Sequence, residues 1–193
     1  MSGIVFDTER SLHPLWQEED VLPAASVREL VCEPCEIGLA RRLNAMWHSR
    51  LPRTQSSPWQ YAFAAHKQGL VYAVALWHNP SARTLPSHWL ELRRLAIASD
   101  APHCTASWML GRMARWFRHS CPDRERLISY QDLAVHTGTI YRAAGWKEGH
   151  RSAPRQRDRS KPRVGTLGRR DYRSNLNGLE PDMSAKVRWE IML

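Results

Sequence analysis

The fold is decided by the stretch Trp59-Gln-Tyr-Ala-Phe-Ala-Ala-His66, Lys67-Gln-Gly69, Leu70-Val-Tyr-Ala-Val-Ala-Leu-Trp77. Its first run alternates in polarity, and its last run is apolar and as long as an ordinary strand. The three residues between them end in a glycine, which is typical of a tight turn between strands. The stretch therefore predicts an antiparallel β-hairpin at the centre of a sheet.

A third strand is expected over residues 88–97, because this segment also alternates. Strict alternation places Trp89, Glu91, Arg93 and Leu95 on one face of the strand and Leu90, Leu92, Arg94 and Ala96 on the other. Arg94 would then lie among apolar residues, where a charge is costly unless it is paired or bound to a ligand.

Patterns on both sides of these three strands complete the fold class. The expected elements are a strand over 26–31, a helix over 37–46, a helix that Thr105 or Ser107 caps and that ends before Pro122, a strand over 126–130, a helix over 137–144 stopped by Gly145, and a last strand over 186–192. Three sequential strands followed by a strand–helix–strand crossover predict an α+β fold with a mixed sheet.

Charge is distributed unevenly along the 193 residues, whose formal net charge is +9. Residues 1–40 carry eight acidic and two basic residues, whereas residues 151–193 carry eleven basic and five acidic ones. We expect an N-terminal acidic extension over 1–25, one domain over 26–150, and a basic C-terminal arm over 151–193 that includes the possible final strand. A basic, arginine-rich arm favours a polyanionic partner, although a solvated tail is the plainer alternative.

Neither a membrane location nor a disulfide scaffold is expected. The longest apolar stretches, such as Val71–Trp77, are far shorter than the roughly 20 residues of a spanning helix, and residues 1–14 lack the pattern of a signal peptide. Four cysteines are too few for a disulfide framework, and Cys32 and Cys35 have no second pair at the spacing of a zinc finger. We therefore expect a cytoplasmic protein with reduced thiols.

Two segments add a family resemblance. They are Leu92-Arg-Arg-Leu-Ala-Ile-Ala-Ser-Asp-Ala-Pro-His-Cys-Thr-Ala-Ser107 and Ser129-Tyr-Gln-Asp-Leu-Ala-Val-His-Thr-Gly-Thr-Ile-Tyr-Arg-Ala-Ala-Gly-Trp146. Together with the element order, they resemble the phage Mom family, which are DNA adenine-modification proteins built on a divergent GNAT acyltransferase fold. The resemblance covers roughly residues 37–150 and implies a GNAT-like fold here.

The GNAT resemblance implies an acyl-CoA donor such as acetyl-CoA. Ordinary GNAT proteins have a glycine-rich turn before the helix that receives the pyrophosphate, because bare amides must approach it closely. The corresponding segment here, residues 101–108, contains no glycine. Ile97, Thr105 and Ser107 are the expected cofactor contacts. The hydroxyls of Thr105 and Ser107 would bind the pyrophosphate together with backbone amides. The alternative is that either hydroxyl only caps the helix.

Four residues are the candidates for catalysis: Arg94, Asp132, Tyr141 and His48. The resemblance implies a catalytic-site role for Arg94, and a buried ion pair with Asp132 is the alternative. Asp132 and Tyr141 could act as base and acid or as oxygen ligands to a metal. The alternative is that Asp132 caps a helix and Tyr141 packs in the core.

The resemblance also implies iron (Fe2+), with Asp132 and Tyr141 near the metal. Residues 47–49 are similar to a family segment His-Tyr-Ser, so that His48 falls where the family has its tyrosine. Imidazole can replace phenolate as a ligand, which makes His48 the third candidate metal ligand, and an ordinary surface histidine is the alternative. His136 is a further candidate beside the site.

Contacts with DNA are expected from the arm and from the loop after the first helix. Trp47 could stack on an extruded base, and the remaining candidates are basic: Arg50, Arg53, Arg155, Arg157, Arg159, Lys161 and Arg163.

Three functions follow from these observations. The leading hypothesis is a Mom-like enzyme that modifies adenine in DNA. The second is a conventional N-acetyltransferase acting on an amine of a small molecule or protein. The third is a catalytically inert module that binds nucleic acid.

Overall fold

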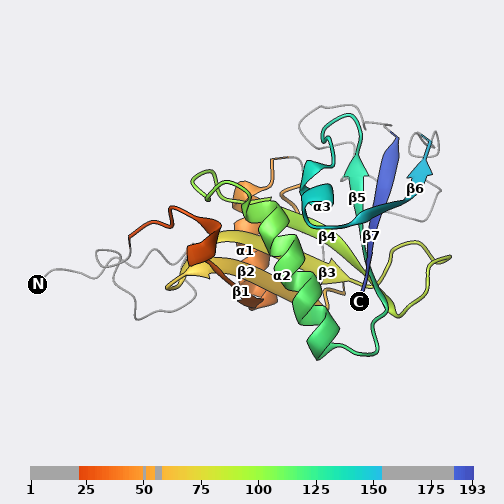
Figure 1. The fold of residues 1–193 in the computed structure, drawn as a ribbon, viewed down its shortest axis with the longest axis horizontal. Helices are drawn as coiled ribbons and strands as arrows, with labels where there is room; N and C mark the ends of the chain where they lie inside the picture. Colours follow the sequence, from red (N-terminus) through yellow and green to blue (C-terminus); the bar gives the residue numbers. More distant parts are fainter. Residues whose placement is uncertain (1–21, 50, 55–57, 154–184) are drawn as a thin grey trace, which may run out of the picture.

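The computed structural model describes residues 22–49, 51–54, 58–153 and 185–193, which form a seven-stranded mixed sheet with three α-helices (Figure 1). The strand order is β1-β2-β3-β4-β5-β7-β6, in which β4 and β5 are parallel and the other neighbours antiparallel. The strands are β1 (Val31–Pro34), β2 (Tyr61–Lys67), β3 (Leu70–His78), β4 (Trp89–Ile97), β5 (Arg126–Asp132), β6 (Lys147–Ser152) and β7 (Lys186–Met192), and the helices are α1 (Ile37–Trp47), α2 (Thr105–Ser120) and α3 (Thr139–Ala143). The predicted α+β class is confirmed.

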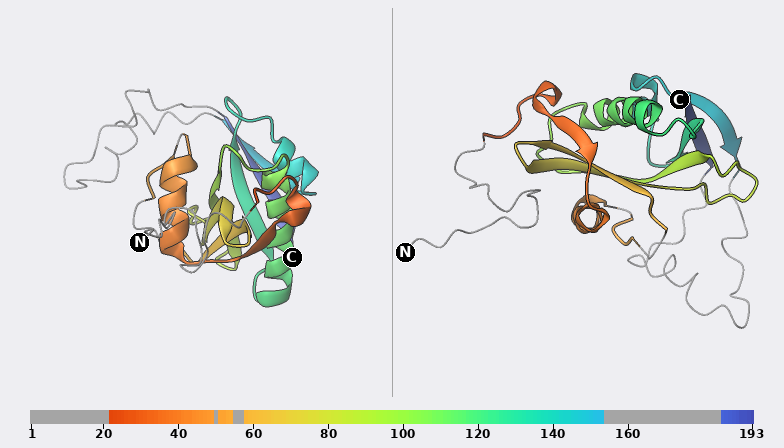
Figure 2. Two further views of the ribbon diagram at one scale, coloured as in Figure 1. Left: turned by 90° about the vertical axis from the view of Figure 1, so that its left-hand side faces the viewer. Right: turned by 90° about the horizontal axis from the view of Figure 1, so that it is seen from below.

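The helices cover the two faces of the sheet (Figure 2). α1 packs on β2, β3 and β4 from one side, around a cluster that contains Leu43 and Val74. α2 and α3 lie on the other side, over a larger core with Trp77 and Phe117 at its centre. We call these the α1 face and the α2/α3 face of the sheet.

The hairpin predicted over residues 59–77 forms. β2 and β3 pair antiparallel across a turn in which Gln68 and Gly69 both have positive φ angles, 48° and 89°. Two consecutive positive φ angles give a turn whose twist matches that of the flanking strands. All but the first residue of β3 are buried, because helices cover both faces of this part of the sheet.

The faces predicted for β4 are wrong beyond Leu92, because the strand contains a β-bulge. Leu92 is the cross-strand partner of Trp77, but Arg94 is the partner of Leu76, so β4 has one extra residue opposite β3. A bulge shifts the alternation by one residue. Leu92 therefore faces α2, whereas Arg94 lies on the α1 face with Leu76.

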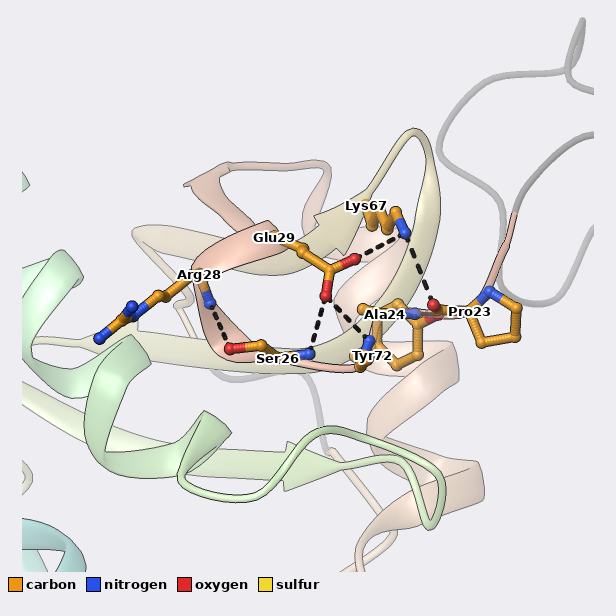
Figure 3. Close-up of polar contacts among 8 residues, drawn as sticks. Pro23, Ala24, Ser26, Arg28, Glu29, Lys67 and Tyr72 are labelled. Carbon is orange, nitrogen blue, oxygen red and sulfur yellow. Dashed lines mark hydrogen bonds and ion pairs between the residues drawn. The ribbon is translucent and has the colours of Figure 1, made fainter.

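The strand predicted over 26–31 is also wrong, since Val27–Glu29 forms a 3₁₀ helix before β1. Ser26 and Glu29 make a capping box: the Ser26 hydroxyl accepts from the Arg28 amide, and the Glu29 carboxylate accepts from the Ser26 amide at 3.0 Å (Figure 3). These local hydrogen bonds satisfy backbone groups that, in a strand, would have bonded to a neighbouring strand.

This N-terminal segment is attached to the end of the hairpin (Figure 3). The Ala24 amide donates to the Tyr72 hydroxyl at 2.9 Å, and Lys67 Nζ contacts Glu29 at 2.7 Å. The hydrogen bond from Lys67 lowers the pKa of the Glu29 carboxyl. Ala24 and Leu30 are buried, so these residues belong to the core that the sheet builds.

The C-terminal residues form the predicted last strand, β7, which lies inside the sheet between β5 and β6. β6 was not predicted. Lys186, the first residue of β7, is the cross-strand partner of Ser152, the last residue of β6. The basic segment 154–184 therefore connects two neighbouring strands, and its own structure lies outside the described residues. The predicted domain boundaries at residues 25 and 150 remain predictions.

Among the described residues, no helix has both the length and the apolar character needed to cross a bilayer.

Candidate functional site

The parallel strands β4 and β5 pair only over their first halves. Their register runs from Trp89 opposite Arg126 to Leu92 opposite Ser129, and no further pair follows, although β4 continues to Ile97 and β5 to Asp132. The strands therefore separate toward their carboxyl ends. Open sheets bind ligands at such ends, where backbone groups are left without a neighbouring strand.

Ser129 lies at the point of separation. Its hydroxyl donates to the Leu92 carbonyl across the two strands at 3.3 Å, and it lies 2.9 Å from the hydroxyl of Tyr141 on α3. A serine hydroxyl has a single proton, so while that proton is donated to Leu92 the bond with Tyr141 uses the phenol proton. Both residues are buried. Ser129 was not among the residues predicted for the site.

Tyr141 is held in one orientation by aromatic neighbours. Its ring stacks on Trp189 of β7 with centroids 5.4 Å apart and an interplanar angle of 10°, and Trp146 lies 5.8 Å away. Burial raises the pKa of the Tyr141 phenol, and the hydrogen bond with Ser129 opposes this rise only in part. The phenol is therefore protonated at neutral pH and can act as a proton donor.

Gly138 makes this packing possible. It precedes α3 with a φ of 75°, and a Cβ atom there would lie 2.6 Å from both Gln131 Oε1 and Trp189 Cζ2. Gln131 in turn accepts from Trp189 Nε1 at 2.7 Å and donates to the His136 carbonyl. Only glycine combines the left-handed conformation with so close an approach.

A cavity of about 280 Å³ opens beside the separated strands. Its lining comes from the end of β4, the segment before α2 with the first turn of α2, and α3: Ile97, Pro102, His103, Cys104, Thr105, Ala106, Ser107, Thr139, Ile140 and Ala143. The three residues predicted to contact a cofactor are all in this lining. Their role remains a prediction.

The first turn of α2 presents backbone amides to this cavity. The N-cap residue is Cys104, which has a φ of 69°, and not Thr105 or Ser107 as predicted. The Thr105 hydroxyl donates to the Pro102 carbonyl at 2.6 Å and the Ser107 hydroxyl to the Cys104 carbonyl at 3.1 Å. The hydroxyls thus stabilise the turn, and the Thr105 amide also donates to the Pro102 carbonyl, at 3.2 Å.

Arg94 and Asp132 lie on the α1 face. Arg94 is buried, and its Nη1 donates to the Arg93 carbonyl at 2.8 Å. Asp132 is half-buried, and its Oδ1 accepts from the Ala134 amide at 3.0 Å. Because side chains alternate along β5, Asp132 points away from the face that carries Ser129. Asp132 and Tyr141 thus lie on opposite faces of the sheet beside the point of separation, and the expectation that both point into one cleft stays a prediction.

His48 is the C-cap residue of α1, the helix that lies on the opposite side of the sheet from α3 (Figure 2). Its Nδ1 accepts from the Leu51 amide at 3.2 Å, and the neighbouring Asn44 donates to the Leu51 and Pro52 carbonyls. The histidine thereby holds the loop after α1. His136, the further candidate, is exposed in the turn after β5.

Two of the three predicted metal ligands are not brought together, because His48 follows α1 and Tyr141 lies in α3 on the other side of the sheet. Within residues 22–49, 51–54, 58–153 and 185–193, no three His, Cys, Asp or Glu side chains are arranged to hold a metal ion. Burial raises the pKa of the Cys32 and Cys35 thiols to about 12, which disfavours the thiolate form that a metal needs. The described residues therefore do not fit the iron site that the resemblance implies.

Two of the residues predicted to contact DNA are described. Trp47 is half-buried against the α1 side of the core, and Arg53 is exposed in the following loop. The others lie outside the described residues: Arg50, Arg155, Arg157, Arg159, Lys161 and Arg163.

Comparison with known proteins gives a family and a fold. The family model of the Mom protein family matches residues 55–162. A search of curated proteins found no match.

The solved structures that the chain resembles are acetyltransferases. An acetyltransferase from Bacillus subtilis in complex with CoA has a TM-score of 0.54 at 10% identity, with 85% of this chain and 99% of that chain covered. A GNAT family acetyltransferase from Elizabethkingia anophelis with acetyl-CoA bound has a TM-score of 0.52 at 10% identity, covering 86% and 99%. The ribosomal-protein-S5-alanine acetyltransferase from Vibrio fischeri has a TM-score of 0.53 at 9% identity, covering 85% and 93%. At these identities the likeness establishes the GNAT fold.

Proposed function

The chain belongs to the Mom protein family, and from this premise we propose that it is a GNAT-fold transferase that moves an acyl group from a CoA thioester to adenine in DNA. The observation that carries the proposal is the separation of β4 and β5 after Leu92 and Ser129, with a lined cavity on one side and a buried proton donor, Tyr141, at the point of separation.

The cavity is the proposed donor site. Its apolar lining, which includes Ile97 and Ile140, suits the pantetheine chain, and the first turn of α2 offers amides and a positive helix end to the pyrophosphate. The Bacillus subtilis and Elizabethkingia anophelis structures contain CoA and acetyl-CoA, respectively. This supports the same class of donor here, although the turn lacks glycine.

The proposed chemistry needs one proton donor. The exocyclic amine of adenine attacks the thioester carbonyl, the new C–N bond forms, and the C–S bond breaks to leave the CoA thiolate. Tyr141 donates its proton to that thiolate, and the amine loses a proton to solvent or to a nearby base. The Ser129 hydroxyl then donates toward the phenolate oxygen, which stabilises it until it is reprotonated.

The acceptor is proposed to enter from the α1 face. Arg94 on β4 places a positive charge on this face, and Asp132 at the end of β5 places a carboxylate on the same face. A carboxylate could accept the amine proton, and a guanidinium could orient the base through its ring nitrogens. Trp47 at the end of α1 and Arg53 in the following loop could contact the nucleotide. Because the described residues do not assemble a ligand set for iron, no step is assigned to it.

DNA as the partner is supported by charge. The segment 154–184 carries eight basic and four acidic residues, and arginine binds phosphate with two parallel hydrogen bonds. The strands that flank this segment are neighbours in the sheet: Ser152 of β6 pairs with Lys186 of β7, and Lys186 pairs with Asp132 of β5. Lys186, which follows the basic segment in the sequence, is thus beside Asp132 of the proposed site.

A conventional N-acetyltransferase is the second candidate, favoured by the cavity and the acetyltransferase fold alone. The two functions separate in one experiment. Mass spectrometry of nucleosides from plasmid DNA of expressing cells should reveal a new adenosine mass if DNA is the acceptor. Unaltered nucleosides together with tight acetyl-CoA binding would favour a small-molecule or protein amine, and salt-sensitive DNA binding without any product would favour an inert binding module.

A further inference from the structure

An apolar turn projects at the end of β5. Leu133 and Val135 are each 40% exposed, and the turn that holds them connects β5 to α3, which carries Tyr141. In Figure 1 it forms the tip above β5 and α3. Isolated exposed apolar residues are common on protein surfaces. Here two of them share one short turn that directly follows the separated part of β5.

The backbone of this turn is fixed. The Asp132 carboxylate accepts from the Ala134 amide, and the Asp132 carbonyl accepts from the Val135 and His136 amides at 3.2 and 3.0 Å. The Leu133 amide donates to the Ala185 carbonyl at 3.1 Å, which attaches the turn to the residue before β7. The two apolar side chains are thus presented to solvent on a backbone that is hydrogen-bonded on both sides.

The residues beside the turn favour a negatively charged partner that also has apolar surface. Lys186 is the cross-strand partner of Asp132, and the Ala185 carbonyl accepts from the Leu133 amide, so the described residues that follow the basic segment 154–184 in the sequence lie beside the turn. Nucleic acid combines phosphates with the apolar faces of its bases, whereas an acidic protein surface offers charge without stacked rings. A duplex therefore fits this combination best.

We propose that Leu133 and Val135 are a wedge that enters the base stack of duplex DNA when the target adenine is extruded. This inference rests on the proposed function and adds the means of reaching a base inside a duplex. An enzyme that acts on a base must unstack and unpair it, and apolar side chains inserted between base steps offset that cost. A turn fixed by Asp132 keeps the wedge in place without an ordering cost.

The test compares paired and unpaired adenine. Duplexes with one central adenine and randomised flanking positions are prepared with thymine or with an abasic site opposite the adenine. Both are incubated with the full-length protein and a deproteinised cell extract as the source of the donor. The double variant Leu133→Ser/Val135→Ser should modify the paired adenine about 10-fold or more slowly than wild type and the unpaired adenine at the wild-type rate.

The matched control is Val31→Ser, which changes another exposed apolar residue far from the turn along the chain. It should leave both rates unchanged. If the double variant and wild type modified the paired adenine at equal rates, the wedge proposal would be overturned. An equal loss of rate on both duplexes would also overturn it, because such a loss indicates a docking or structural role. If wild-type protein modifies neither duplex, the proposed function itself fails and the wedge fails with it.

Discussion

The hydroxyl groups of Ser129 and Tyr141 lie 2.9 Å apart, at the place where β4 and β5 stop pairing. The Ser129 hydroxyl also bonds the Leu92 carbonyl, so a chain of hydrogen bonds runs from the edge of β4 to α3. Burial raises the pKa of the Tyr141 phenol and keeps it protonated at the site where a thiolate would leave. The proposed chemistry depends on this arrangement.

Removing only the phenol oxygen should separate chemistry from folding. Tyr141→Phe retains the ring that stacks on Trp189 but has no proton to donate. We expect the modification rate to fall about 100-fold, within the usual range for losing a general acid. Loss of one buried hydrogen bond should cost only about 1 kcal/mol of unfolding free energy. Tyr61→Phe, which removes a phenol oxygen on the far strand β2, should leave the rate unchanged.

Gly138 should be intolerant of any side chain. Gly138→Ala places a Cβ atom against Gln131 and Trp189 and forces alanine into a left-handed conformation, so we expect a loss of about 3 kcal/mol or more in the free energy of unfolding. Gly145→Ala is the control: its φ of 77° is equally left-handed, but nothing lies within 4 Å of the added Cβ. It should cost about 1–2 kcal/mol. Equal losses in urea denaturation would contradict the crowding at Gly138.

Filling the cavity should block the donor without affecting DNA binding. Ala143 lines the cavity from α3, and Ala143→Phe should weaken acetyl-CoA binding at least about 10-fold by calorimetry. Ala45→Phe makes the same change on the exposed side of α1 and should have no effect. Unchanged affinity in Ala143→Phe would place the donor elsewhere.

His78 should make the fold sensitive to mild acid. It is buried on the α1 face beside its cross-strand partner Glu91, and burial lowers the pKa of its imidazole, although Glu91 opposes this change. A lowered folded-state pKa means that the unfolded chain binds the proton more readily. Stability is therefore complete above the ordinary value of 6.5 and is lost as the pH falls through the lower folded value. His78→Gln should reduce this pH dependence of the melting temperature in thermal denaturation. An unchanged pH dependence in His78→Gln would contradict the prediction.

Local patterns predicted most of the elements, because they depend on neighbouring residues. The hairpin around Gly69, the helix α1 and the last strand β7 each carry their own periodicity. The face predicted for Arg94 was wrong, because a bulge depends on the register between two strands. The alternation of residues within β4 does not reveal such a bulge. The capping box of Ser26 and Glu29 was a local signal for a helical turn, and the β-branched run beside it obscured that signal.

The site was harder to predict than the fold, because its key contacts join distant segments. Tyr141 was predicted from the motif after β5, but its partner Ser129 could have been found only from the face that β5 presents to α3. The stacking of Tyr141 on Trp189 depends on β7 lying beside β5, across a connection of more than thirty residues. His48 was grouped with Tyr141 by resemblance, although α1, which His48 follows, and α3, which contains Tyr141, lie on opposite sides of the sheet (Figure 2).

The proposed function is the transfer of an acyl group to adenine in DNA through a site at the separation of β4 and β5. The most direct test is nucleoside mass spectrometry of plasmid DNA from cells that express the wild-type chain, Tyr141→Phe or Tyr61→Phe. We expect a new adenosine mass with wild type and with Tyr61→Phe, and its loss with Tyr141→Phe. Unaltered adenosine with all three proteins, or an undiminished product with Tyr141→Phe, would contradict it.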